Sequence, residues 1–297
     1  MSRYEYVDSQ KAEPTNRNPV VKMCHWLDVS TSGFYHWRGR PQSATQVRRH
    51  ALSARVQHFF EDSEGTYGYR RIHADLVDEG SECSPELVRH IMRDEGLIAC
   101  QPRPFRVTTD ADAEAAWSIP DLVKRDFTAV RPGVKFVGDI TYIHTWQGFI
   151  YVATVIDCFS KKVVGWSIAD HMRAELVEDA LRNAATTTVI EAEAIFHSDR
   201  GSVYTSAIYR ALVGRLGMRS SMGRTGVCWD NALAESFFSA LKNERVHRTV
   251  YATKAHAKRD VIMYIEGFYN NRRRHSALGY RRPNDVHYAY QQQALAA

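Results

Sequence analysis

Three acidic side chains have the types and the spacing that phosphoryl-transfer chemistry requires. Asp139 lies within an apolar segment, residues 136–143, where a charge is costly unless it is paired or bound to a metal. Asp199 follows a second apolar segment, and 35 residues separate it from Glu235. Two aspartates and one glutamate are hard oxygen ligands, and such ligands hold two divalent ions about 3.5–4 Å apart in two-metal sites. The set predicts a site that activates an attacking hydroxyl and stabilises a departing 3′ oxygen.

The elements around these carboxylates predict an α/β fold. Segments 136–143, 149–156 and 162–168 alternate, are rich in β-branched and aromatic residues and follow one another closely, which favours an antiparallel meander. After them we expect, in order, a helix at 173–187, a strand at 194–197, a helix at 206–216, a strand at 218–221, and helices at 230–246 and 254–270. This order is that of a ribonuclease-H-like mixed five-stranded sheet flanked by helices. In it the first and fourth strands are neighbours, so both aspartates can face the helix of Glu235.

The residues before the sheet predict a small all-helical, helix-turn-helix module. Residues 1–44 are expected to be an arm without clear periodicity followed by a helical hairpin, and residues 45–100 a helix-turn-helix-like module. Prolines break residues 101–124, which we interpret as a linker. The catalytic core with its basic C-terminal helix and tail is expected at 125–288. The arginines of the module could contact DNA phosphates or form a solvated face.

Composition excludes several classes of protein. The 297 residues carry a net charge of +5, and the five cysteines form no CxxC pair. No signal peptide is recognisable, and no apolar stretch approaches the roughly 20 residues that span a bilayer. A secreted disulfide scaffold and a membrane protein are therefore excluded, and a reduced cytoplasmic protein is expected.

Basic charge is concentrated near the C-terminus. From Lys242 to Arg282 there are eleven Lys and Arg residues against three acidic ones. This excess predicts contact with a phosphate backbone, although a solvated basic surface remains an alternative. The residues expected to bind DNA are Lys242, Arg245, Arg272, Arg273, Arg274 and His275.

Two other residues have simpler interpretations. Asp157 ends the second predicted strand and is expected to serve a turn rather than to act as a fourth ligand. His197 is expected to be structural, because Mg²⁺ disfavours imidazole.

The chain resembles a known family. Asp139, Asp199 and Glu235 match the D…D-x35-E pattern of the second-reading-frame (OrfB) transposases of IS3-family insertion sequences, within the retroviral-integrase-like DDE superfamily. Lys242 matches the basic residue that this family has seven positions after the glutamate, two helical turns away. The sequence around each carboxylate and the tail 269–280 also match. Phe136 departs from the pattern, since the family has Trp there.

The resemblance implies a catalytic mechanism and partners. Asp139, Asp199 and Glu235 would bind Mg²⁺, with Mn²⁺ as a substitute, and no zinc is expected. The enzyme would cut a strand at the ends of the element and then join the free 3′-OH to another phosphodiester. Expected partners are DNA, at the terminal inverted repeats and the target, the first-frame OrfA protein or its frameshift fusion, and further copies of the chain on DNA.

Two rival functions remain open at this point. A hydrolytic nuclease of the same fold would cut DNA without joining it. A non-catalytic DNA-binding protein would keep only the helix-turn-helix function. The sequence around the carboxylates argues against the first rival, and the complete carboxylate set argues against the second.

Overall fold

The computed structural model describes residues 2–101, 119–223 and 228–296, which form two compact units, Met1–His58 and Phe59–Ala297. The predicted linker, residues 101–124, lies largely outside the described residues. The division falls within helix α4 (Ala44–Asp62), so the rest of the predicted helical module belongs to the same unit as the sheet.

The first unit contains three short helices ahead of α4. They are α1 (Arg3–Ala12), α2 (Val20–Trp26) and α3 (Thr31–Arg38), and they bury Val7, Met23, Cys24 and Phe34 against one another. The helical hairpin expected here is present.

The expectation of an arm without regular structure is wrong for residues 3–12. Ser2 and Glu5 form a capping box at the start of α1, which satisfies backbone N–H groups that a helix end leaves unpaired. Val7 then packs into the small core. This tertiary contact stabilises the helix, although the sequence of the segment has only a weak helical periodicity.

The second unit begins with the end of α4, followed by α5 (Tyr69–Asp78) and α6 (Pro85–Asp94). Helix α6 starts with Ser84 as N-cap and Pro85 in its first turn, both of which suit the start of a helix. Ile72 and Leu76 of α5 and Ile91 of α6 are buried.

Five strands form one mixed sheet. They are β1 (Lys135–Thr145), β2 (Gly148–Asp157), β3 (Val163–Ala169), β4 (Ile195–Ser198) and β5 (Arg219–Met222). Their order in the sheet is β3-β2-β1-β4-β5; β1 and β3 pair antiparallel to β2, whereas β1 with β4 and β4 with β5 are parallel. The predicted mixed five-stranded sheet of ribonuclease-H-like order, with its first and fourth strands adjacent, is confirmed.

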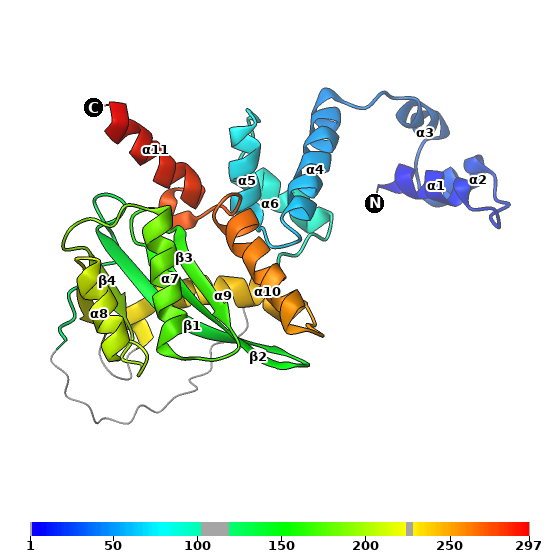
Figure 1. The fold of residues 1–297 in the computed structure, drawn as a ribbon. Helices are drawn as coiled ribbons and strands as arrows, with labels where there is room; N and C mark the ends of the chain where they lie inside the picture. The colour runs from blue at the N-terminus through cyan, green and yellow to red at the C-terminus, as the bar shows by residue number, and fades with distance from the viewer. Residues whose placement is uncertain (1, 102–118, 224–227, 297) are drawn as a thin grey trace. The chain divides into compact units, whose positions relative to one another are not determined.

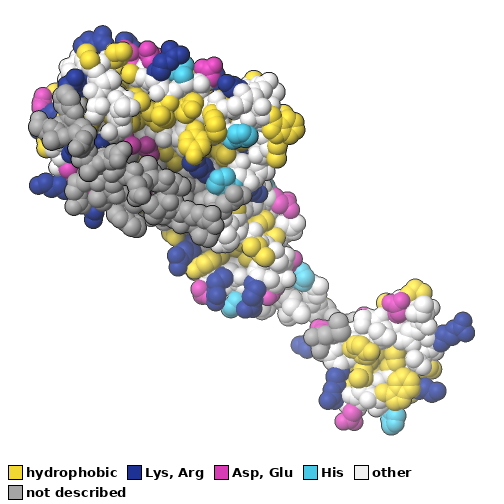
Figure 2. Space-filling model, turned by 90° about the horizontal axis from the view of Figure 1, so that it is seen from below, with side chains coloured by type: hydrophobic (Ala, Val, Ile, Leu, Met, Phe, Trp, Pro, Cys, Tyr) yellow, Lys and Arg dark blue, Asp and Glu magenta, His cyan; other side chains and the backbone are white. Residues whose placement is uncertain are grey.

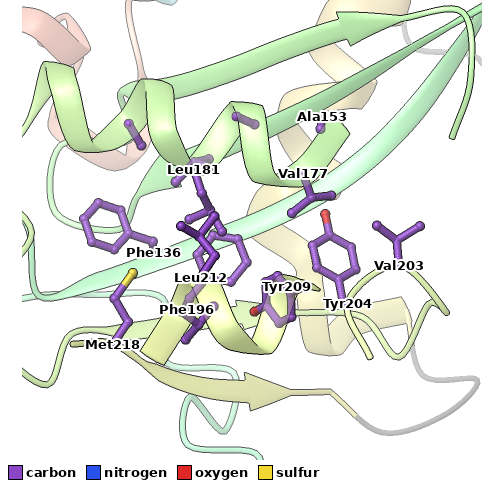
Figure 3. Close-up of a cluster of buried hydrophobic side chains, with 14 of the residues drawn as sticks. Phe136, Ala153, Val177, Leu181, Phe196, Val203, Tyr204, Tyr209, Leu212 and Met218 are labelled. Atoms are coloured by element: carbon purple, nitrogen blue, oxygen red, sulfur yellow. The ribbon is translucent and has the colours of Figure 1, made fainter. Parts of the chain in front are cut away.

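Helices cover both faces of this sheet (Figure 1). On one face α7 (Ala174–Thr187) and α8 (Ala207–Arg215) enclose a core in which Phe136, Phe196 and Tyr209 meet (Figure 3). On the other face α9 (Ala232–Glu244) and α10 (Lys254–Ile262) pack on alternate strand residues such as Val137 and Ile150. Successive side chains of β1 and β2 point to opposite faces of the sheet, so each strand contributes residues to both cores.

The chain ends in further helical segments that contact the sheet and the turn between β2 and β3. Helix α10 continues as a π-helical stretch, Met263–Tyr269, and α11 (Pro283–Ala296) follows after a tight turn. None of the helices in the described ranges is long and apolar enough to cross a lipid bilayer.

Candidate active site

The parallel pairing of β1 with β4 brings the two aspartates to one level of the sheet. Val137 lies opposite His197 in this ladder. Continuing the register by two residues places Asp139 opposite Asp199, just beyond the end of β4. Gly138 permits this close approach, because a Cβ there would lie 2.3 Å from the ring of Phe196. The sequence-based prediction that these strands bring the two carboxylates together therefore agrees with the register.

Burial raises the proton affinity of all three carboxylates, and that of Asp139 is raised further by its two neighbours. Burial, followed by the charges of Asp199 and Glu235, raises the pKa of Asp139 to about 7. Burial also raises the pKa of Asp199 and the pKa of Glu235. The three side chains from β1, the end of β4 and α9 thus form a partly dehydrated acidic cluster, and a bound cation would relieve its repulsion.

The start of α9 is bound directly to both strands that bear the aspartates. The Asn231 side chain donates a hydrogen bond to the carbonyl oxygen of Gly138, with 3.1 Å between Nδ2 and O. His197 Nε2 lies 2.7 Å from the carbonyl oxygen of Asp230. Since Glu235 lies on the next turn of the helix, these bonds fix its carboxylate relative to Asp139 and Asp199.

His197 is neutral and fully buried, and its hydrogen bonds define its tautomer. A carbonyl oxygen can only accept, so Nε2 carries the proton, and Nδ1 accepts from Ser221 Oγ at 2.8 Å. Burial lowers the pKa of His197, which keeps the ring neutral. Ser221 Oγ in turn accepts from the Leu122 amide, and Arg125 Nε donates to Asp230 at 2.7 Å. The structural role predicted for His197 is confirmed; Asn231 and Asp230 are positioning residues that the sequence reasoning did not identify.

Lys242 acts electrostatically on this cluster. It lowers the pKa of Asp139, and burial lowers its own pKa while Asp139 raises it. Its ammonium also lies 5.5 Å from the centre of the Tyr142 ring. Lys242 and Glu235 therefore both lie close enough to Asp139 to act on it, which agrees with the prediction that they share one face of the helix.

The carboxylates suit Mg²⁺ ions that are each bound by a pair of them, rather than a single ion bound by all three. In the described ranges, no three Asp, Glu, His or Cys side chains gather closely enough to hold a single ion. Mg²⁺ keeps several waters and needs only one or two carboxylates, so pairs that share Asp139 fit its requirements. The Ile140 amide donates a hydrogen bond to Oδ1 of Asp139, and the Gly201 amide donates one to Oδ1 of Asp199.

Asp157 has the structural role that its position predicted. It is fully buried and accepts hydrogen bonds from the Gly133 amide and from the amide and hydroxyl of Ser160. These contacts close the turn between β2 and β3, so the carboxylate serves the fold.

Arg273, expected to bind DNA, has a different place in the structure. Its guanidinium is buried and donates from Nε and Nη2 to the Glu244 carboxylate of α9, at 2.6–3.0 Å. Glu244 also accepts from the Tyr264 hydroxyl and, at 3.4 Å, from Arg71 of α5. Burial opposes ionisation of Glu244, but Arg273 and Arg71 outweigh it and lower its pKa. We call this group, together with the Arg274 contacts below, the arginine clamp.

Arg274 likewise faces inward. It donates to Asp75 at 2.8 Å and to Asp78, both on α5. The Tyr67 hydroxyl also binds the backbone of this segment: it donates to the carbonyl oxygen of Arg272 and accepts from the amide of Arg274. The arginine clamp thus holds α5 against the C-terminal tail, and DNA contact by Arg273 and Arg274 finds no support because both side chains are buried and paired with acidic groups of the chain.

The other residues predicted to bind DNA also differ in how far they are paired or buried within the chain. Arg245 forms a bidentate pair with Glu64, at 2.7 and 3.0 Å, and Arg272 pairs with Asp62. His275 is partly buried, and burial with the nearby arginine charges lowers its pKa to about 4. Of the six predicted DNA-binding residues, Lys242 is the one that acts on the acidic cluster.

Three family models match the sequence. Residues 129–228 and 216–283 match models described as an integrase core domain, and residues 47–105 match a model described as an HTH-like domain. The two core matches together contain Asp139, Asp199 and Glu235.

Curated relatives cover most of the chain. The transposase for insertion sequence element IS904 of Lactococcus lactis is 37% identical over 83% of this chain and 97% of its own length. Transposase InsF for insertion sequence IS3A of Escherichia coli is 36% identical over 93% of this chain and 95% of its own length.

Solved structures with a similar fold are more distant in sequence. The catalytic core domain of HTLV-2 integrase in complex with magnesium is 14% identical and aligns with 53% of this chain and 98% of its own, with a TM-score of 0.41. The catalytic core domain of BIV integrase is 15% identical and aligns with 55% of this chain and 99% of its own, with a TM-score of 0.41.

We predict that Asp139→Asn stabilises the metal-free protein at pH 8 by about 2 kcal/mol, because it removes a buried charge that faces two others. The pKa of Asp139, about 7, lies above the roughly 3.9 of an unfolded aspartate, so the wild type loses stability as pH rises through this range. The free energy of unfolding in EDTA should show the gain at pH 8 and little gain at pH 4.

Asp157→Asn is the matched control, since it changes a buried carboxylate whose oxygens accept hydrogen bonds. That variant should lose stability at pH 8. A loss of stability in both variants would contradict the proposed repulsion at Asp139.

We also predict that Glu244→Gln lowers the free energy of unfolding by about 3 kcal/mol at pH 7, because it leaves the buried Arg273 unpaired. The lowered pKa of Glu244 means that its contribution is present above the unfolded value near 4.3 and is lost as pH falls through the folded value. The difference between variant and wild type should therefore shrink in acid.

Urea unfolding from pH 7 to pH 3 measures this difference. Glu64→Gln, at an exposed ion pair with Arg245, should cost under about 1 kcal/mol. Equal effects of the two substitutions would mean that the arginine clamp adds nothing beyond a surface pair.

Proposed function

The chain belongs to the IS3-family insertion-sequence transposases, and from this premise we propose that Asp139, Asp199 and Glu235 hold the Mg²⁺ ions with which it cuts and joins DNA strands. As a member of this family it is an enzyme of DNA transposition with an integrase catalytic core. The finer assignment, to metal, residues and individual steps, is our proposal.

The main support is the electrostatic coupling of three carboxylates from three separate elements. Burial, followed by the charges of Asp199 and Glu235, raises the pKa of Asp139 to about 7. Folding such repulsion into a protein is unfavourable unless a cation compensates it in the working enzyme. Bound Mg²⁺ would supply Lewis-acid activation of the attacking hydroxyl and stabilisation of the departing 3′ oxygen.

The side chains divide the remaining tasks. The three carboxylates would hold the metal ions, which would supply binding of the scissile phosphate, while Asn231 and His197 keep α9 in place against β1 and β4. Lys242 donates to a phosphate oxygen of the terminal DNA beside Asp139. Water cleaves one strand at the element end, and the freed 3′-OH then attacks a second phosphodiester, with no covalent link between protein and DNA.

The partners follow from this reaction. A transposase binds DNA, and we assign recognition of the terminal inverted repeats to the HTH-like segment, residues 47–105. Joining two ends requires both in one complex, so at least two copies act together on DNA. We expect the first-frame OrfA protein, or its fusion to this chain, to take part in the bacterial cytoplasm.

Asp199→Asn and Glu235→Gln should each reduce strand joining about a thousandfold, since each removes about 4 kcal/mol of metal-dependent stabilisation. Their affinity for DNA should stay within about threefold of wild type. The assay incubates full-length protein with a labelled duplex of the element end, in Mg²⁺ and in EDTA, and separates cut from joined strands.

Asp170→Asn, an exposed carboxylate after β3, is the matched control and should join strands normally. Joining by the Asp199 variant would disprove the assignment. Cutting without joining by the wild type would identify a nuclease instead.

Asn231→Ala should slow joining about ten- to a hundredfold and raise the Mg²⁺ concentration needed for half-maximal rate, because Glu235 loses its fixed position. A Mg²⁺ titration of the joining rate measures both effects. Asn271→Ala, at an exposed position outside the site, should change neither value. An unchanged Mg²⁺ requirement in the Asn231 variant would remove its positioning role.

A further inference from the structure

The end of the β1–β2 hairpin extends past the neighbouring strands (Figure 1). In the ladders, β4 pairs with β1 only from Lys135 to Val137, and β3 pairs with β2 from Tyr151 onward. Residues 143–150 therefore form a two-stranded ribbon, and at its base Tyr142 pairs with Tyr151, which still has β3 beside it. Tyr142 lies three residues beyond Asp139, about 10 Å along β1, and Lys242 links the two positions, because it acts on Asp139 and its ammonium lies near the Tyr142 ring.

The two faces of this ribbon differ in an unusual way. Ile143 and Ile150 are buried against α10 and its surroundings, as expected for an inner face. The outer face carries aromatic rings, although the outer face of an antiparallel ribbon is ordinarily polar. Tyr142 and Phe149 are 59% and 44% exposed, and their ring centres lie 5.4 Å apart, edge to face.

His144 completes this group. It lies directly opposite Phe149 in the ladder, with 5.3 Å between the ring centres, and is exposed. We call Tyr142, His144 and Phe149 the aromatic platform. Three rings on one exposed face, beside the catalytic carboxylates, have no role in either core of the unit.

Lysines flank the platform. The Lys242 ammonium lies 5.5 Å from the centre of the Tyr142 ring, and Lys254 approaches the turn at Gly148. The sequence has no acidic residue between Asp139 and Asp157. Rings between cations are the combination that binds single-stranded nucleic acid, in which bases stack and phosphates are neutralised. Figure 2 shows exposed hydrophobic side chains beside histidine and basic side chains on one face of the molecule.

A protein partner fits this surface less well. A stable protein interface buries about 800 Å² on each side, whereas three partly exposed rings offer well under the 150–250 Å² apiece of fully buried aromatics. A single nucleotide base matches the size of the platform.

We propose that the aromatic platform stacks an unpaired base of the DNA strand whose phosphate reacts at Asp139, within about three nucleotides of that phosphate. Lys242 then contacts the phosphate between the stacked base and the reacting position. This inference rests on the proposed function for the place of the strand, and it adds a binding site for a base extruded from the duplex end. Stacking holds the strand end away from its complement while the carboxylates act on it.

The test is a double-mutant cycle between ring and base, measured by binding alone. Full-length protein in EDTA is titrated against labelled duplexes of the element end with the last three pairs mismatched, and a single abasic site replaces each of these bases in turn. Tyr142→Leu should weaken binding of the intact duplex about tenfold, and one abasic position should weaken wild type equally. At that position the two changes together should cost no more than either alone.

Two variants serve as controls. Tyr142→Phe keeps the ring and should bind like wild type. Tyr288→Leu removes another exposed tyrosine that lies beside a lysine, Lys162 at 4.3 Å, but on α11, and should leave binding unchanged.

Additive losses at every abasic position would overturn the inference. It would also be overturned if Tyr142→Leu changed the oligomeric state in sedimentation without changing DNA affinity, since that result would identify a protein contact. Neither outcome depends on strand joining, so failure of the proposed catalysis would be seen separately, as the absence of joined strands with wild type in Mg²⁺.

Discussion

The attachment of the first turn of α9 to β1 and β4 is the constraint on which the site depends. Three carboxylates that repel one another would move apart unless their backbones were held, and the bonds from Asn231 to Gly138 and from His197 to Asp230 hold them. Because His197 is buried and neutral, this attachment adds no charge to the cluster. The scaffold therefore keeps the carboxylates close together despite their repulsion, and this arrangement is ready to bind a cation.

Charge is balanced differently in the two halves of the second unit. In the arginine clamp, buried guanidinium groups meet Glu244, Asp75 and Asp78, and the charges are paired inside the chain. Around Asp139, in the part of the chain that the structure describes, two further carboxylates raise its pKa and Lys242 lowers it. Charges that are paired within the chain indicate a structural role, whereas charges without such a balance indicate a site for a ligand. This contrast distinguishes the structural acidic residues from those of the active site.

Much of the fold and the acidic cluster could be predicted from the sequence, because periodicity, capping residues and the spacing of Asp139, Asp199 and Glu235 are local or pairwise signals. The role of Arg273 and Arg274 could not, since their acidic partners stand far away in the chain and a run of arginines is equally typical of a DNA-binding surface. One signal was present: Asp75 lies between Ile72 and Leu76 on the buried face of α5, where a carboxylate requires a partner.

The arginine clamp also has a consequence for how such genes can recombine. Its acids on α5 and its arginines in the tail are encoded almost 200 codons apart, yet they meet in the folded protein. A crossover between two diverged elements that falls between these codons would join one parent's acids to the other's arginines. Where the parents differ, the hybrid would bury a cation without its counter-charge. Viable mosaics of this family should therefore inherit α5 and the tail from the same parent, even when the catalytic strands between them come from another.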